Sequence, residues 1–555
     1  MCGRCLTLML VVSLGAVTTL GQVTLQEVYR STVLEGSPDE GYYDDENNWV
    51  SVPYMSSMNQ VGHIGVSVNG SHVAVNARGF WGVGNGHMYM YGTESGGAAP
   101  GSWTVMNMDP TFLDDFSNGR FGGPGPKLQL SATGLPLLAG VRYRNDTGDD
   151  TNYRVVWSDN LGAGSPWKYS DITTDVTTRR CINQRTSSFE LLPSGRQGLV
   201  YLGDPTSNGW RYFEAEYNSG TDQWVKATSE IQLAATAMGN GVNTLVDPTN
   251  GRVRLFVPNW GMAAVTSGGS SSGRFQFPGY SDLTYAVRAA AGSDGRYYVV
   301  GVNDSGQVNL VDFEYDEAAN DLASGTTAGQ YYIDGSNSDP NWVTCPVVDY
   351  DDASGAVVVA YMKGVSNGDE GWWEGNDLGN GAAAVDLYVR IGERDGDGNL
   401  VFGDPVLIAD NAARFRDTRG DYLSRPLDMK VVENPGGNSS LYLVYGEFDD
   451  DVVNGFNSKN VVVVKYTLLG GAVPGDTDGD GDVDLDDLFA VRNHFGTASG
   501  ATRADGDTDG DGDVDLDDLF AVRNNFGTGL MVIPEPTAVC LMVIGSVALL
   551  RRRQR

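Results

Sequence analysis

One pattern recurs seven times between residues 24 and 470 and constrains the fold more than any other feature of this chain. Each instance is an alternating strand, a turn that contains glycine, and a second strand richer in Val, Leu and Tyr. The seven instances are Val66–Val75, Leu128–Val141, Phe189–Gly203, Asn243–Val257, Ala286–Val302, Val347–Met362 and Met429–Gly446. In three units a strand, a polar turn and a tryptophan follow: Tyr89–Trp103, Tyr153–Trp167 and Tyr212–Trp224. Regularly spaced short strands of this kind are typical of all-β folds.

The length of the repeat indicates a propeller. Residues 24–470 divide into seven units of about 64 residues, and a unit of that size holds a four-stranded blade. Radial repetition also protects the edges of so many short strands. We therefore predict a closed seven-bladed β-propeller over residues 24–470, with its N-terminal and C-terminal strands in the same blade or in neighbouring blades. Six blades is the near alternative, and an array of β-sandwiches is the far one.

One turn of this body resembles that of a known propeller class. Ser158-Asp159-Asn160-Leu161-Gly162, followed by Trp167, looks like a degenerate Asp-box, the turn of the BNR-repeat (sialidase-like) propellers. The class includes sialidases and polysaccharide lyases such as ulvan lyases, which use His and Tyr with an Arg near the uronate. The resemblance therefore implies processing or binding of polysaccharide. The Arg-Ile-Pro motif of true sialidases is absent from the sequence, which argues against sialidase activity.

The candidate catalytic residues are His63, His87, Arg142 and Tyr143. A lyase needs a base to remove a proton next to a carboxyl group, an acid for the leaving oxygen, and a cation to hold the uronate. His63 and His87 belong to the first unit, and Arg142 with Tyr143 ends the first strand pair of the second unit, so they can face one channel. The alternative is that these histidines are surface and turn residues of a glycine-rich region.

Aromatic and acidic residues offer further candidates. Five aromatic residues lie in glycine-rich loops, where they can stack on sugar rings or pack at the loop bases: Phe80, Trp81, Trp260, Trp372 and Trp373. The chain has 71 acidic residues, so the sequence selects no carboxylate pair for a glycosidase. Whether the protein is an enzyme is therefore open, with glycoside hydrolase and polysaccharide lyase as the enzyme classes.

Residues 475–497 and 506–528 are a duplication, identical except that His494 stands where the second copy has Asn525. Each copy fits a calcium loop, with carboxylates at loop positions 1, 3, 5, 9 and 12, a glycine at position 6 and a carbonyl ligand at position 7. Without a cation, so many carboxylates would repel one another. We predict two Ca²⁺ ions, with these ligands: Asp476, Asp478, Asp480, Asp482, Asp484, Asp487, Asp507, Asp509, Asp511, Asp513, Asp515 and Asp518.

A helix is predicted after each loop but not before it, because Gly and Pro residues fill 470–475. The first helix carries an apolar stripe that we expect the two copies to bury against each other: Leu485, Leu488, Phe489 and Phe495. This loop-helix pair over residues 475–528 resembles the dockerin domain, which implies a cohesin-like partner. Loop positions 10 and 11 are Leu-Asp in both copies, whereas dockerins often carry Ser/Thr-type residues there. The alternative is a calcium-stiffened spacer.

Both ends of the chain are predicted to be targeting signals. Residues 1–22 have the order of a secretory signal, with Arg4 before an apolar run and a small-x-small site at the end. Residues 532–555 resemble the PEP-CTERM sorting signal, with Pro534-Glu535-Pro536, a short hydrophobic helix and a terminal Arg cluster. That resemblance implies an exosortase-type processing enzyme. We expect an exported bacterial protein at the cell surface or in the extracellular matrix, anchored transiently in the membrane by its C-terminus.

Charge and cysteine content limit the partners further. The net charge of −34 makes nucleic acid an unfavourable partner, because phosphate backbones would be repelled. Cys181 and Cys345 of the body fit either one long-range disulfide or two separate thiols. The combined prediction is a surface protein that processes or binds polysaccharide through a propeller and carries a calcium-dependent dockerin-like module. A non-catalytic glycan-binding or structural surface protein is the alternative.

Overall fold

A computed structural model describes residues 23–527 of the chain with several gaps. Residues outside the description are 1–22, 35–40, 44–48, 52–60, 82–83, 108–118, 132–134, 145–151, 160–166, 174–186, 203–208, 235–242, 304, 336–342, 365–382, 396–397, 416–426, 435–437, 449–457, 470–474, 478–482, 500, 503–504, 509–511 and 528–555. The chain divides into two compact units, of which one is Val23–Leu469. The other contains the duplicated loops. The predicted signals at both ends, and Cys181, lie outside the described residues.

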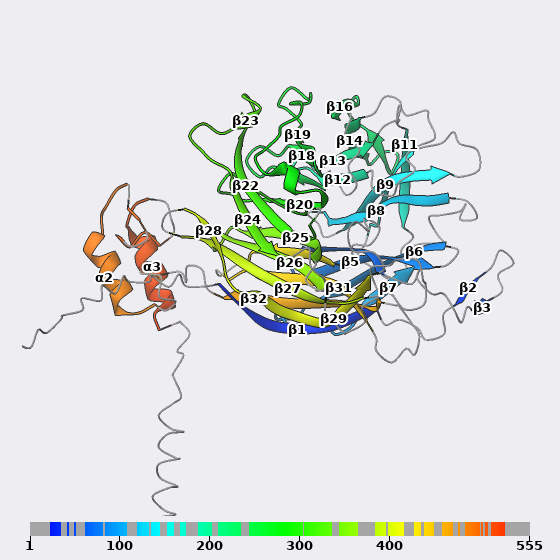
Figure 1. Ribbon diagram of the computed structural model, residues 1–555. Coiled ribbons are helices and arrows are strands. Elements are labelled where there is room, and N and C mark those ends of the chain that lie inside the picture. Colours follow the sequence, from blue (N-terminus) through cyan, green and yellow to red (C-terminus); the bar gives the residue numbers. More distant parts are fainter. Residues whose placement is uncertain are drawn as a thin grey trace, which may run out of the picture. The chain divides into compact units, whose positions relative to one another are not determined.

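Val23–Leu469 is a seven-bladed β-propeller (Figure 1). Blades 1 to 3 consist of β4 (Val61–Asn69), β5 (His72–Trp81), β6 (Gly84–Thr93) and β7 (Thr104–Asn107); β8 (Gly119–Leu130), β9 (Pro136–Arg144), β10 (Asn152–Trp157) and β11 (Lys168–Thr173); and β12 (Ser187–Leu191), β13 (Gln197–Leu202), β14 (Trp210–Asn218), β15 (Gln223–Lys226) and β16 (Ile231–Ala234). Blades 4 and 5 consist of β17 (Asn243–Val246), β18 (Val253–Val257) and β19 (Gly261–Ala264); and β20 (Tyr285–Ala291), β21 (Arg296–Val302), β22 (Val308–Asp316), β23 (Asp321–Leu322) and β24 (Gly329–Asp334).

Blades 6 and 7 complete the ring. They consist of β25 (Val343–Asp351), β26 (Ala356–Gly364), β27 (Ala383–Arg394), β28 (Leu400–Phe402) and β29 (Val406–Phe415); and β30 (Leu427–Val432), β31 (Ser440–Phe448), β32 (Ser458–Leu469) and β1 (Thr24–Leu34). A separate hairpin pairs β2 (Gly41–Tyr43) with β3 (Trp49–Ser51). Each of the seven strand pairs expected from the sequence forms the first two strands of one blade, so the prediction of seven blades is confirmed.

The ring is closed by the two ends of the propeller chain. β1 is the outer strand of blade 7 and runs antiparallel to β32, from Thr24 opposite Leu469 to Leu34 opposite Val461 (Figure 1). The first and last strands therefore share a blade, as the sequence predicted. The first strand of each blade also contacts the first strand of the next blade all the way round.

The core consists of seven hydrophobic clusters, one between each pair of neighbouring blades. β31 shows how one strand serves two of them. Its residues Leu441, Leu443 and Tyr445 face blade 6, whereas Tyr442 and Val444 face blade 1. Successive side chains of a strand point to opposite faces, so a strand buried on both faces has a continuous apolar sequence. This explains why the second strand of most units is so rich in Val, Leu and Tyr.

The C-terminal unit contains α2 (Leu485–His494) and α3 (Leu516–Asn525), each directly after its loop. The two copies are joined reciprocally. The backbone N–H of Gly496, after α2, donates to the carbonyl of Val514 (2.8 Å), and that of Gly527, after α3, donates to the carbonyl of Val483 (2.7 Å). Val483, Val514 and one valine of each helix form a small buried core. Neither helix is long and apolar enough to cross a membrane, and these are the described α-helices of the chain.

Leu488 of the predicted apolar stripe is partly buried against the valine core, but the rest of the stripe is exposed, so for those residues the prediction was wrong. Leu485, Phe489 and Phe495 expose 55, 44 and 50 % of their surface, and their counterparts in the second copy are exposed to a similar degree. The reason is a close backbone approach at Gly475, which has φ +98°. A Cβ at Gly475 would lie 2.6 Å from the Cα of Val522, so the copies meet at a glycine and a valine instead of at the larger side chains.

The interface between blades 6 and 7 offers a test of ring stability. Leu443 is fully buried there, so Leu443→Ala should lower the free energy of unfolding by about 2–5 kcal/mol through lost contacts and a cavity. The matched control is Leu407→Ala, because Leu407 is 52 % exposed and its truncation should change stability by less than about 0.5 kcal/mol. Equilibrium urea denaturation measures both. Equal effects in the two variants would contradict the assignment of the core.

Candidate functional site

The two ends of the ring differ in what they carry. At one end, here called the hairpin end, lie the turns between the first and second and between the third and fourth strands of each blade. At the other, the interblade end, lie the loops between the second and third strands and the connections from blade to blade. His63 and His87 lie near the interblade end of blade 1, and the backbone register sets both of them opposite Arg78 of β5.

Arg142 and Tyr143 lie at the same end of blade 2, in the last residues of β9. The register sets Arg142 opposite Asn152 and Tyr143 opposite Arg120. The side chains of all four candidate catalytic residues lie outside the described part of the structure. The strand positions bring the four residues to one end of the ring, and their catalytic role stays a prediction.

An aromatic and basic cluster lies at the interblade end of blade 4. Trp260 is in the loop between β18 and β19, which is tied to the connection into blade 5 by a hydrogen bond from Asn259 N–H to the carbonyl of Leu283 (2.9 Å). The guanidinium of Arg274 lies 5.3 Å from the ring centre of Trp260 and 5.6 Å from that of Tyr280. Its Nε donates to the carbonyl of Trp260 (2.8 Å), so rings and cation form one unit.

The sequence pointed to Trp260 but not to its neighbours. Of the five aromatic residues predicted to stack on sugars, only Trp260 has a described side chain; it is half-buried and packs against the cluster between blades 3 and 4. Arg274 and Tyr280 were missed because they lie in residues 265–283, where no strand pattern recurs. The absence of the repeat in this segment was the one sequence signal that could have marked it as a candidate site. In blade 4 this segment takes the place of a regular fourth strand, and it forms the isolated bridges Met262–Phe275 and Val265–Ser271.

The axis of the propeller is lined by polar side chains that satisfy one another. Carboxylate, amide and hydroxyl groups on the first strand of one blade accept backbone N–H groups of the next, in the pairs Leu130–Ser67, Leu191–Gln129, Ala289–Asn243, Val431–Asp349 and Val66–Asp428. Lys430 Nζ donates to Asp349 (3.0 Å), and the negative charge of Asp349, followed by those of Asp428 and Glu190, raises the pKa of Lys430. These contacts give the axial residues a structural role.

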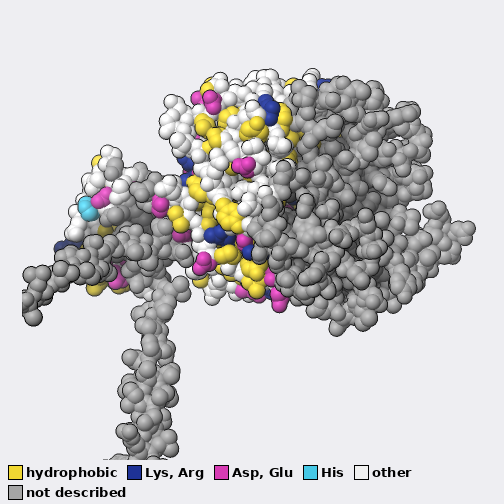
Figure 2. All heavy atoms as spheres, viewed as in Figure 1, with side chains coloured by type: hydrophobic (Ala, Val, Ile, Leu, Met, Phe, Trp, Pro, Cys, Tyr) yellow, Lys and Arg dark blue, Asp and Glu magenta, His cyan; other side chains and the backbone are white. Residues whose placement is uncertain are grey.

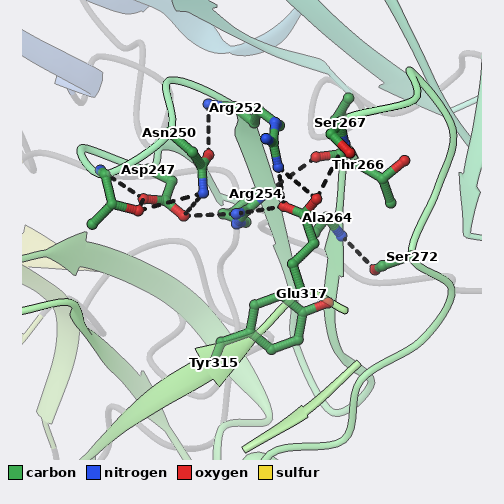
Figure 3. A network of polar contacts seen from close by, with 12 residues as sticks. Asp247, Asn250, Arg252, Arg254, Ala264, Thr266, Ser267, Ser272, Tyr315 and Glu317 are labelled. Carbon is green, nitrogen blue, oxygen red and sulfur yellow. Dashed lines mark hydrogen bonds and ion pairs between the residues drawn. The ribbon is translucent and has the colours of Figure 1, made fainter. Parts of the chain in front are cut away.

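A buried charge network joins blades 4 and 5 near the hairpin end (Figure 3). Asp247, just after β17, accepts hydrogen bonds from Arg254 Nη2 and from the hydroxyl of Tyr297, both at 2.6 Å. Arg254 also donates to Glu317 (3.1 Å), which in turn binds Arg252 (2.6 Å). Burial alone would raise the pKa of Asp247, but hydrogen bonds from Thr249 and Tyr297 and the charge of Arg254 lower it below its usual value.

The described surface of the propeller has no patch of one charge on the face seen in Figure 2, where hydrophobic side chains lie among charges of both signs. The exposed large apolar residues of the described propeller are distributed over six blades: Val28, Val105, Tyr169, Tyr217, Tyr332, Val401, Val406 and Leu407. They are scattered residues and indicate no site by themselves.

The calcium loops are described in part. Asp478, Asp480, Asp482, Asp509 and Asp511 lie outside the described residues. In the second loop, carboxylate oxygens of Asp513, Asp515 and Asp518 lie within 4.8 Å of one another. Asp518 is held by hydrogen bonds from the backbone N–H of Thr508 (2.6 Å) and of Asp515 (2.8 Å), and Gly512 at position 6 has φ +88°. The first loop repeats the contact from position 9 to position 12, with Asp484 N–H donating to Asp487 (2.7 Å).

These donors fit a hard divalent cation. Asp476, Asp487, Asp507 and Asp518 are all at most 5 % exposed, and the sequence between Gly475 and Gly527 holds 15 Asp against three Arg. Carboxylates gathered at such a point are favourable only when a cation neutralises them. The three clustered carboxylate oxygens include that of Asp513, for which the loop spacing predicted a carbonyl ligand, so the cluster shows a candidate metal site but not the predicted ligand set. Ca²⁺ bound there would supply the positive charge that the loops need.

Comparisons with known proteins give only distant structural likenesses. No protein-family model matches the chain, and no curated protein matches its sequence. Among solved structures, the polysaccharide lyase Uly1 is 9 % identical and covers 81 % of this chain and 99 % of its own, with a TM-score of 0.39. A protein of unknown function from Dyadobacter fermentans DSM 18053 is 12 % identical, covers 62 % of this chain and 96 % of its own, and has a TM-score of 0.35.

The NanB sialidase from Streptococcus pneumoniae is also similar. It is 12 % identical, with 80 % of this chain and 70 % of that chain covered and a TM-score of 0.35. The solved structures similar to this propeller thus include a sialidase and a polysaccharide lyase. None of these likenesses bears on what this chain binds or catalyses.

The Asp247 network predicts a dependence of stability on pH. Because the pKa of Asp247 is lower in the folded than in the unfolded state, its stabilisation is complete above the unfolded value of about 3.9 and is lost as the pH falls through the folded value. Asp247→Asn should cost about 3 kcal/mol at pH 7 and flatten the acid limb of the stability profile. Urea denaturation between about pH 2.5 and pH 7 measures this, with Asp321→Asn, at an exposed position, as control. An unchanged acid limb in Asp247→Asn would refute it.

Proposed function

We propose that this chain is an exported bacterial surface protein that binds or processes polysaccharide at the interblade end of its propeller and carries a module that folds around two calcium ions. The export and surface location rest on the predicted signals at residues 1–22 and 532–555. The proposal of a calcium-binding module rests on the duplicated loops. The proposal of polysaccharide as the ligand rests on the propeller and its aromatic residues.

The observation that carries the calcium part is the convergence of Asp513, Asp515 and Asp518 at the start of α3. The described core of the module is small, with four fully buried valines and three partly buried residues. So little buried apolar surface does not by itself hold a unit of this size. Binding of Ca²⁺ would add the missing free energy, because the ligands are brought together only when the loop folds.

Substitution of the ligand at loop position 12 tests this part. Asp518→Asn should remove the second site, so that titration calorimetry of the full chain finds one Ca²⁺ where the unmodified chain binds two. The matched control is Asp517→Asn, the exposed neighbour in the first turn of α3, which should leave both sites intact. An unmodified chain that binds one ion or none would contradict the proposal.

The observation that favours polysaccharide is the pair of rings at the interblade end of blade 4. Trp260 and Tyr280 flank an exposed guanidinium there, and aromatic faces beside polar groups suit the apolar and hydroxyl faces of a sugar ring. His63, His87 and Arg142 reach the same end of the ring through blades 1 and 2. Binding at this end can therefore extend over several blades.

A panel of neutral and anionic polysaccharides tests the second part. We expect the full chain to bind at least one of them, and Trp260→Ala to weaken that binding about tenfold by removing a stacking face. Tyr332→Ala is the control, because Tyr332 is 55 % exposed on an outer strand and should leave affinity unchanged. Failure to bind any polysaccharide would overturn this part.

The same panel separates an enzyme from a binding protein. Release of reducing ends indicates a glycoside hydrolase, and absorbance of an unsaturated uronate indicates a polysaccharide lyase. Substitution of His63 or His87 should then abolish turnover without loss of fold. Binding without turnover favours the non-catalytic glycan-binding or structural protein.

Two partners besides calcium are proposed, one for the module and one for the C-terminal signal. Exposed Leu485, Phe489 and Phe495, repeated in the second copy, support a cohesin-like module that covers the helices. An exosortase-type enzyme is proposed for the C-terminal signal from the Pro534–Pro536 motif. If no cohesin-like partner binds, the calcium-stiffened spacer is the better description of the module.

A further inference from the structure

Arg274 is unusual among the described cations of the propeller. Most of them are held by carboxylates of the chain itself, as in the pairs Arg154–Asp171, Arg296–Asp312, Lys363–Asp334 and Lys465–Glu94. This is expected in a chain with 71 acidic and 37 basic residues. Arg274 is exposed, yet no ion pair joins it to any described carboxylate. Its charge is therefore available to a group from outside the chain.

The guanidinium of Arg274 is nevertheless held in place. Its Nε donates to the carbonyl of Trp260 (2.8 Å), and its central carbon lies over the rings of Trp260 and Tyr280. These contacts leave both Nη groups without a hydrogen bond to any described residue. An arginine whose orientation is fixed loses little entropy when it binds a carboxylate or sulfate with two parallel N–H bonds.

The backbone around Arg274 is fixed as well. Phe275 is 5 % exposed, pairs with Met262 across the blade and stacks among the aromatic residues between blades 4 and 5. Its neighbours Arg274 and Gln276 point the other way and are exposed. Gln276 Nε2 donates to the hydroxyl of Tyr280, which places the amide of Gln276 beside Tyr280. Cation, rings and amide thus lie on one rigid edge of blade 4.

We propose that Trp260, Arg274, Gln276 and Tyr280 form a subsite for an acidic sugar, that is, a uronate or a sulfated unit of a polysaccharide. The two Nη groups of Arg274 donate to the carboxylate or sulfate, the aromatic rings contact the apolar face of the sugar, and Gln276 binds a hydroxyl. This inference rests on the proposed function, because it names the class of polysaccharide. The selectivity follows from charge: elsewhere the acidic chain repels an anion, so an acidic saccharide is directed to an exposed cation that has no described carboxylate partner.

The experiment compares four probes on the full chain in the presence of Ca²⁺, by titration calorimetry. They are trigalacturonate, a sulfated galactose oligosaccharide, neutral cellotriose and sodium sulfate. The variants are Arg274→Gln, Arg274→Lys and the control Arg196→Gln, which removes an exposed arginine of the hairpin end that is paired with Glu214. Circular dichroism and thermal unfolding verify that each variant is folded.

We expect one or both acidic oligosaccharides to bind, Arg274→Gln to weaken that binding about tenfold, Arg274→Lys to restore it in part, and Arg196→Gln to change nothing. The two acidic probes distinguish a carboxylate from a sulfate. Binding of sodium sulfate as tight as that of the oligosaccharides would overturn the role of the rings. Binding of cellotriose as tight as that of the acidic probes would overturn the class.

Failure of this inference is distinguishable from failure of the proposed function. If a polysaccharide of the panel binds but Arg274→Gln has no effect on the acidic oligosaccharides, the subsite is wrong while the proposed function stands. If an acidic oligosaccharide binds through Arg274 but no polysaccharide does, the subsite stands and the polymer is excluded. If no saccharide binds, both are refuted.

Discussion

The propeller depends on the pairing of β1 with β32. The two strands come from opposite ends of residues 23–469, and their antiparallel register turns seven stacked sheets into a ring. Glu94 of blade 1 reinforces the junction, because it accepts hydrogen bonds from Tyr29 of β1 (2.7 Å), Tyr442 of β31 (3.1 Å) and Lys465 of β32 (2.7 Å). A buried carboxylate with three donors from the closing blade favours one register over its alternatives. Every other interface gains from closure, since no blade is then left with an uncovered apolar face.

Arginines in the turns of the hairpin end differ from Arg274 in what holds their charge. At the hairpin end, Arg196, Arg252 and Arg296 each follow a glycine of positive φ in the turn between the first two strands of a blade. All three bind carboxylates on or just after a third strand, of the same blade or of the next. The charges of these three turns are therefore paired within the chain. At the interblade end of blade 4, Arg274 is instead held by the rings of Trp260 and Tyr280. The strands of the blade supply a rigid support, and the irregular segment 265–283 supplies a guanidinium that no described carboxylate binds.

The sequence was sufficient to predict the propeller fold, but it was insufficient to predict which side chains are exposed on the module and at the interblade end. The seven hairpins were predictable because burial on both faces leaves a direct record in the sequence, as in the apolar run of β31. The helices and the turn at Gly512 were predictable from loop spacing. The exposure of Phe489 was not, because it depends on how closely Gly475 approaches Val522. Arg274 was not predictable either, since its partners Trp260 and Tyr280 are brought to it by the blade and not by spacing. His63, His87, Arg142 and Tyr143 were placed at one end by topology, whereas their side chains lie outside the described part.

The propeller and the module differ in how the charges of their acidic residues are compensated. In the propeller, buried carboxylates such as Asp247 and Asp312 are paired with arginines of neighbouring strands, although the propeller as a whole keeps an excess of acidic residues. Between Gly475 and Gly527 there are 15 Asp and three Arg, too few cations for a comparable balance. The reciprocal contacts of Val483 and Val514 bring both loops onto one small core, which increases the repulsion between their carboxylates. An external cation of high charge is the remaining way to offset that repulsion. This is the physical reason for proposing that the module folds only with a bound cation.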